Sequence, residues 1–173
     1  MYRRLDDFRA QFQEEVDDTL KVLRAIPDSA AAQAVAPAHR DLRRMAWHLV
    51  ESLVSLPAQI GLQVDGPAVN DCGTSLEAIP DSMEAIQARY QRAASSLLSG
   101  LASWTDADLL KEDTLYGHLV WTKGYSLRAL EMHQAHHRGQ MTVLMRQAGL
   151  EVPEFYGPTL EGWAALGVPA PVV

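Results

Sequence analysis

Two histidines four residues apart, His133 and His137, are the side chains whose type and spacing could do chemistry. On a helix, residues i and i+4 project from adjacent turns of one face, with Cβ atoms about 6 Å apart. Both rings could therefore hold one metal ion at about 2.0–2.1 Å. The alternative is that both are core histidines satisfied by hydrogen bonds. Two histidines stacked on one buried face favour the metal.

The segment that carries this pair is predicted to be a long helix from about Tyr125 to Ala148, begun by Thr122 or Ser126 and ended by Gly149. At about 100° per residue, both histidines fall in the middle of its apolar stripe. An imidazole buried there is costly unless its ring nitrogens have partners. At the same angular spacing, Glu131 and Arg138 are expected on the solvent-facing side of the helix.

A second face of this helix is also partly apolar. His136 points about 100° from His137 and is a poor ligand for the same ion. It falls on a face with Ala129, Met132, Gln140 and Val143. Exposed apolar patches tend to mark interfaces, so this face predicts a homodimer. The alternative is that the C-terminal tail covers it.

Three further helices must position the histidines. Apolar residues at three- and four-residue steps predict a helix over residues 3–25, ended at Pro27, and a second over residues 38–61, which Pro57 kinks or ends early. Residues 62–80 read as a loop. Asp81, with Glu84 three residues later, predicts the N-cap of a third helix that ends near Gly100.

The remaining segments are less regular. Residues 102–124 are expected to be irregular, and no strand-like alternation is found anywhere in the chain. The tail from about residue 151 is expected to lie across the helices, with Thr159 capping one short helix. The prediction is one all-α domain, residues 1–173, built as a four-helix bundle with an irregular C-terminal tail.

The second predicted helix supplies a third histidine, His48, on the shoulder of its apolar stripe. Glu51, one helical turn after His48, is the only nearby carboxylate. It points away from the apolar stripe of this helix and is therefore expected at the surface. Four other residues could shape a pocket or could simply pack in the core: Trp47, Tyr116, His118 and Trp121.

Composition excludes several classes of protein. The net charge is −7 without a pronounced basic cluster, which argues against binding of nucleic acid. No stretch approaches the roughly 20 apolar residues of a membrane span. The single cysteine, Cys72, excludes an internal disulfide framework and is expected to be a loop thiol without a special role. The expected compartment is the cytoplasm.

The string His133-x3-His137-Arg138-Gly139-Gln140, followed by Gly149 and Phe155-Tyr156-Gly157-Pro158, resembles the DinB/YfiT-like superfamily. The upstream His48, preceded by Trp47, adds to the resemblance. It implies a bundle with up-down-down-up connections, a divalent metal held by His48, His133 and His137, and frequent homodimers.

The resemblance also implies an activity. Family members of known chemistry are transferases or isomerases that use a low-molecular-weight thiol, bacillithiol or mycothiol. The expectation is a metal-dependent enzyme of the thiol-dependent S-transferase/isomerase or hydrolase type acting on a small-molecule substrate. The alternative is a non-catalytic metal-binding scaffold in a stress response. Imidazole ligands suit zinc or nickel, and also iron or copper. No catalytic or thiol-binding residue is identified.

Overall fold

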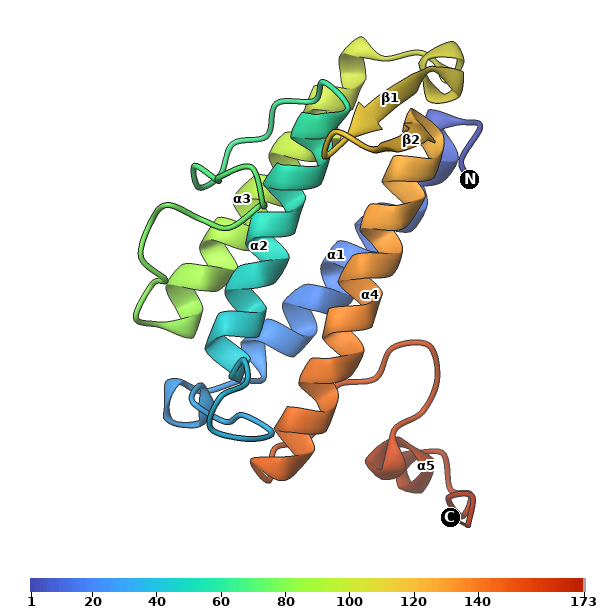
Figure 1. The fold of residues 1–173 in the computed structure, drawn as a ribbon. Coiled ribbons are helices and arrows are strands. Elements are labelled where there is room, and N and C mark those ends of the chain that lie inside the picture. The colour runs from blue at the N-terminus through green and yellow to red at the C-terminus, as the bar shows by residue number, and fades with distance from the viewer. Residues whose placement is uncertain (173) are drawn as a thin grey trace.

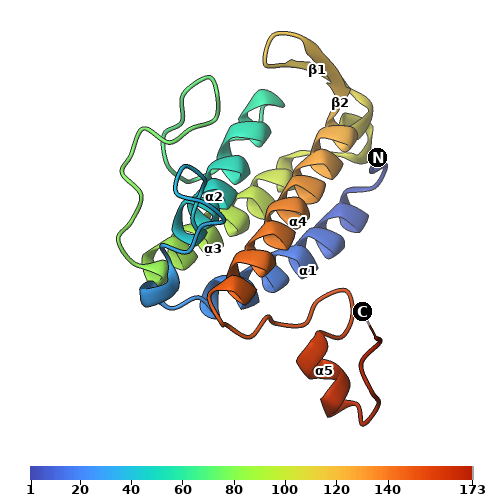
Figure 2. The same cartoon turned by 60° about the horizontal axis from the view of Figure 1, so that its bottom comes forward.

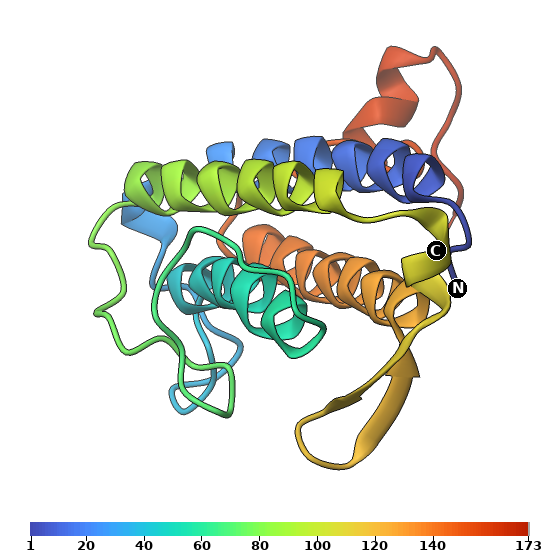
Figure 3. The same ribbon diagram turned by 90° about the horizontal axis from the view of Figure 1, so that it is seen from above.

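The computed structural model describes residues 1–172, and four long helices dominate it (Figure 1). They are α1 (Leu5–Arg24), α2 (Leu42–Gln59), α3 (Met83–Gly100) and α4 (Lys123–Gln147). Helices α1 and α4 run in one direction, and α2 and α3 run in the other. Each of α1 and α2 packs against both α3 and α4, which gives the two layers seen in Figure 3. The predicted up-down-down-up four-helix bundle is confirmed.

The core is formed by the apolar lines that the sequence predicts. Leu56 of α2 is only partly covered. The other predicted core side chains of α1, α2 and α3 are fully or almost fully buried, among them Leu5, Phe8, Phe12, Val16, Leu23, Leu42, Leu49, Leu53, Ile86, Tyr90 and Leu97. No helix in the described part of the chain has both the length and the apolar character that crossing a bilayer requires.

Local capping explains where the helices begin and end. Thr122 accepts a hydrogen bond from the backbone N–H of Tyr125 at 3.2 Å and so begins α4, as predicted. Gly149, at φ +73°, ends α4 in the left-handed conformation that favours glycine. The N-cap of α3 is Ser82 rather than Asp81, because the Ser82 hydroxyl accepts from the N–H of Ala85. Pro57 lies inside the last turn of α2, which ends at Gln59.

Residues 101–122 contain strands that the sequence analysis does not predict. Two short 3-10 helices, Leu101–Ser103 and Asp106–Leu110, lead into the antiparallel strands β1 (Glu112–Leu115) and β2 (Leu119–Thr122). Tyr116 and Gly117 both have positive φ, the pattern of a hairpin turn of type I′. Strands of four residues are too short to show an alternation of polar and apolar residues, so the prediction of an irregular segment was wrong here.

The tail is only partly attached to the bundle. Its first part packs on the core through Val152 and Phe155. Thr159 caps the short helix α5 (Leu160–Ala165), as predicted. The expectation that the whole tail lies across the bundle is wrong, because α5 buries no residue and stands outside the four helices (Figures 1 and 2). An ion pair between Arg146 and Glu161 links it to α4.

Two charged residues of α4 are buried rather than solvent-exposed, which corrects the prediction for Arg138 and Glu131. Arg138 is fully buried and donates to a carboxylate oxygen of Glu15 at 2.5 Å and to the hydroxyl of Thr19 at 3.0 Å. Glu131 accepts from the hydroxyl of Tyr2. The apolar stripe of α4 faces only part of the bundle, and the helix also packs on α1, whose Glu15 and Thr19 pair with Arg138. Glu131 is paired instead by Tyr2, which precedes α1.

Candidate metal centre

The three histidines that the sequence analysis selects lie together between α2 and α4. His48 comes from α2, and His133 and His137 come from adjacent turns of α4. One ring nitrogen from each lies within 4.8 Å of the other two. This proximity arises because α2 and α4 are packed neighbours, so a lone histidine on one helix faces the i, i+4 pair on the other.

The spacing of the ring nitrogens suits a shared ion. The Nε2 atoms of His48 and His133 are 3.2 Å apart. Two ligands at about 2.0–2.1 Å from a tetrahedral ion are separated by roughly 3.3 Å. A hydrogen bond between the two rings would have a similar length, but the third imidazole, on His137, lies against both rings with centroids 4.6 and 4.4 Å away. The group could therefore hold a metal ion.

Two of the three rings have a second partner that orients them. The Nδ1 atom of His137 lies 2.8 Å from the amide oxygen of Gln140, and the Nδ1 atom of His48 lies 3.4 Å from a carboxylate oxygen of Glu51. In each case Nδ1–H donates to the oxygen, which leaves Nε2 unprotonated and free to bind a cation. Outer partners of this kind fix the ring orientation of metal-binding histidines.

Glu51 is buried, which corrects its predicted place at the surface. It is 1% exposed and accepts from Arg44 at 2.8 Å and from the backbone N–H of Ser75 at 2.8 Å. The loop between α2 and α3 runs back along α2 and supplies that N–H (Figure 1). Burial alone raises the pKa of the Glu51 carboxyl, but hydrogen bonds from His48, Ser75 and Arg44 outweigh it and hold the pKa below its usual range. The carboxylate is therefore charged at neutral pH.

Glu51→Gln should weaken zinc binding about 10-fold or more, because it removes the charge that orients His48. The measurement is competition with a chelator of known affinity. Glu77→Gln is the matched control, since Glu77 pairs with Arg89 at a half-exposed site on the loop between α2 and α3. Equal zinc affinity of wild type and Glu51→Gln would remove Glu51 from the site.

The environment of the two α4 histidines favours their neutral forms. Burial, chiefly, lowers the pKa of His133 to about 4, and positive charge on the neighbouring histidines and on Arg40 lowers it further. Burial also lowers the pKa of His137 to about 4, against the opposing effect of its hydrogen bond to Gln140. Neutral imidazole is the form that binds a metal, so neither ring has to lose a proton at pH 7.

These shifts predict how stability depends on pH in metal-free protein. In the unfolded chain the two rings titrate near 6.5, whereas in the folded chain they titrate near 4. Between these values the unfolded state binds more protons, so the free energy of unfolding should fall as the pH is lowered from about 6.5 to about 4. Urea unfolding at several pH values measures it.

The double variant His133→Ala/His137→Ala should lose less stability over the same pH range. The control is His39→Ala/His118→Ala, which removes two exposed histidines. If wild type and His133→Ala/His137→Ala decline in parallel, the two rings do not experience the environment described above.

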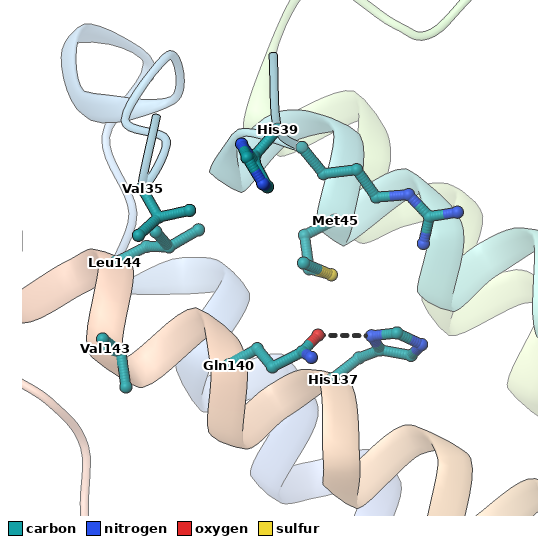
Figure 4. Close-up of a pocket in the computed structure, with 8 residues that line it drawn as sticks. Val35, His39, Met45, His137, Gln140, Val143 and Leu144 are labelled. Carbon is teal, nitrogen blue, oxygen red and sulfur yellow. Dashed lines mark hydrogen bonds between the residues drawn. The ribbon is translucent and has the colours of Figure 1, made fainter. Parts of the chain in front are cut away.

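A cavity of about 450 Å³ adjoins the site at His137 (Figure 4). His137, Gln140, Val143 and Leu144 line it from α4, and Met45 faces them from α2. Val35, His39 and Arg40, from the connection between α1 and α2, complete the wall. We call it the Arg40 cavity, and its walls are mostly apolar.

A second cavity, of about 320 Å³, is lined by the other two histidines, His48 and His133. Tyr116 and Trp121 of the hairpin, which could either shape a pocket or pack in the core, line this cavity together with Ser52, Ser55 and Cys72. Trp47 packs in the core, which is the other alternative for these residues, whereas His118 is exposed on the turn and does neither. Cys72 is an exposed thiol at the wall of this hairpin cavity.

Sequence reasoning missed the roles of Glu51 and Gln140. A shared signal was present, because each follows its histidine by three residues: Glu51 after His48, and Gln140 after His137. Side chains three apart on a helix are neighbours, so an acceptor at that position can reach the ring nitrogen. His136, as expected, is outside the three-histidine group, and it accepts from the Gln140 amide at 3.1 Å.

Comparisons with known proteins agree with the fold that carries this site. The DinB family model matches residues 1–170. A curated relative, the uncharacterized protein YrdA of Bacillus subtilis, is 36% identical over 172 residues, which is 99% of each chain. The crystal structure of a DinB-like protein from Bacillus cereus superposes with a TM-score of 0.82 at 34% identity, covering 90% of this chain and all of that one.

A second solved structure, the DinB-like protein YjoA of Bacillus subtilis, has a TM-score of 0.68 at 18% identity. It covers 87% of this chain and 97% of its own. At that identity the likeness supports the fold alone.

Proposed function

Because this chain belongs to the DinB family, we propose that it is a metal-dependent enzyme of the thiol-dependent S-transferase/isomerase or hydrolase type. Its ligands are His48, His133 and His137, and the ion is zinc or nickel. The observation that carries the proposal is the convergence of three imidazoles with Nε2 atoms free of backbone partners. Three protein ligands are typical of catalytic rather than structural sites, since a position stays open.

When bound, such an ion acts as a Lewis acid that lowers the pKa of a thiol or a water, which supplies a nucleophile at neutral pH. The chain's own residues prepare the site. Glu51 and Gln140 hold the rings of His48 and His137 in the tautomer that exposes Nε2. Burial keeps His133 neutral.

The cavities favour a reaction of two substrates. One is lined by His137 and the other by His48 and His133, so two small molecules can approach the same group of histidines. That arrangement supports transfer between a low-molecular-weight thiol and a second small molecule more than hydrolysis, in which water is one reactant. Thiols of this kind are kept reduced in the cytoplasm, which is the compartment we propose.

The test is the reaction of chlorodinitrobenzene with a panel of low-molecular-weight thiols. The thiol loses its proton to the buffer, its sulfur bonds to the ring carbon, and chloride leaves as the carbon–chlorine bond breaks. Zinc- or nickel-loaded protein should accelerate the reaction with at least one thiol, and His133→Ala/His137→Ala should not. A stoichiometric metal without acceleration for any thiol or hydrolysable ester would favour the alternative, a non-catalytic metal-binding stress-response scaffold.

We also propose a homodimer through the outward face of α4. Tyr125 and Met132 are 45% and 56% exposed on this helix, seven residues apart along one stripe, and Val143, 56% exposed at the end of that stripe, also borders the Arg40 cavity. Met132→Lys should therefore convert a dimer to a monomer in sedimentation velocity, whereas Leu76→Lys, at an exposed residue of the loop between α2 and α3, should not. A wild-type protein that is monomeric at every concentration would contradict this proposal.

A further inference from the structure

The Arg40 cavity combines apolar walls with an exposed arginine that pairs with no other group of residues 1–172. Val35, Met45, Val143 and Leu144 supply the apolar surface. The neighbouring arginines Arg43 and Arg44 pair with Asp81 and Glu51. Among residues 1–172, by contrast, the Arg40 guanidinium forms no ion pair and donates no hydrogen bond, although it lies on the cavity wall.

The cavity also opens onto the metal centre. His137 and its orienting partner Gln140 form part of the wall, and Figure 4 shows both side chains facing the space below Met45. A volume of about 450 Å³ lies in the range of roughly 300–1,000 Å³ that holds small organic ligands. A molecule seated there contacts an apolar surface, a guanidinium and one imidazole of the three.

From this combination we infer that the Arg40 cavity binds a small organic carboxylate with an apolar body, its carboxylate on Arg40 and its body between Met45 and Leu144. A planar guanidinium matches a carboxylate with two parallel N–H···O bonds, which fits a ligand with one such group. The apolar walls select an aliphatic or aromatic body. That this ligand is the substrate rests on the proposed function, whereas its binding does not.

The experiment measures binding of phenylbutyrate, phenylbutanol and phenylbutylamine to chelator-treated protein by titration calorimetry. These probes share one body and differ in the charge of one end. Phenylbutyrate should bind the wild type at least about 10-fold more tightly than the other two. Arg40→Gln should weaken phenylbutyrate about 10-fold or more and leave phenylbutanol unchanged. Arg43→Gln, three residues away, is the matched control and should bind like the wild type.

A second variant keeps the test independent of Arg40. Val35 is 60% exposed, so Val35→Asp should fold and place a carboxylate on the cavity wall. It should weaken phenylbutyrate and strengthen phenylbutylamine. Equal phenylbutyrate affinity for wild type and Arg40→Gln, equal affinity of the wild type for the acid and the alcohol, or no detectable binding would each overturn the inference.

Metal content separates this inference from the proposed function. Because the titrations use protein without metal, phenylbutyrate binding that depends on Arg40 supports the inference even if the histidines never bind an ion. Conversely, a stoichiometric metal with no carboxylate binding leaves the proposed function standing and overturns only the inference.

Discussion

Zinc added to metal-free protein is expected to raise the free energy of unfolding by about 2.7 kcal/mol when the free ion is at 100 times its dissociation constant. The gain arises because the three histidines are assembled only in the folded chain. In a domain of this size it corresponds to a rise in melting temperature of roughly 5–11 °C. His133→Ala/His137→Ala removes two of three ligands and should abolish the rise, measured by differential scanning calorimetry.

His39→Ala is the control for this experiment, since it removes an exposed histidine outside the three-histidine group. It should show the full zinc-dependent rise. A rise that is the same in the wild type and in His133→Ala/His137→Ala would mean that zinc stabilises the protein from another place, and the site assignment would be wrong.

The second large effect is expected at Arg138. Its side chain is fully buried, and it pairs with Glu15, which is itself 3% exposed. Arg138→Met leaves the Glu15 carboxylate buried with only the Tyr156 hydroxyl as a side-chain donor nearby. Removing one partner of a buried pair costs about 3–5 kcal/mol. Urea unfolding of wild type and Arg138→Met measures the loss.

A paired substitution distinguishes lost charge pairing from lost packing. Glu15→Leu/Arg138→Met should recover most of the stability, because an apolar replacement of both partners is often neutral. Zinc affinity of the folded Arg138→Met protein should be unchanged, since Arg138 contacts α1 rather than the histidines. Stability of Arg138→Met within about 1 kcal/mol of wild type would contradict this account of the pair.

The helices and the pairing of His133 with His137 on one buried face could be predicted because their signals are local. Apolar residues at helical spacing set the four long helices, and the end of α4 follows from one glycine, Gly149. The pair His133 and His137 stands out on one face of one helix. His48 joins this pair only through the resemblance of the whole sequence to the DinB/YfiT-like superfamily, because nothing in the helix around His48 distinguishes it as a ligand.

The polar residues around the site could not be predicted in the same way. The burial of Glu51, Glu131 and Arg138 depends on partners that are distant in sequence, such as the Ser75 backbone, Tyr2 and Glu15. A helical wheel ranks residues by apolar character and therefore places every charge outside. Here α4 contacts both α1 and α2, so charged residues of its other faces are buried and paired.

The hairpin and the tail show a different limit. Strands of four residues carry too few positions for a period to be recognised, although Tyr116 and Trp121 of this segment line a cavity beside the histidines. The tail was expected to pack across the bundle through apolar residues such as Leu166, yet Leu166 is 62% exposed. Apolar character alone does not determine which segment finds a surface to cover.

The most direct measurement is metal content by mass spectrometry of protein purified without a histidine tag, beside His133→Ala/His137→Ala prepared identically. The account predicts close to one zinc or nickel ion per wild-type chain and none in the double variant. Wild-type protein that lacks metal and takes up neither ion when it is added would contradict the proposal that these histidines form a metal centre.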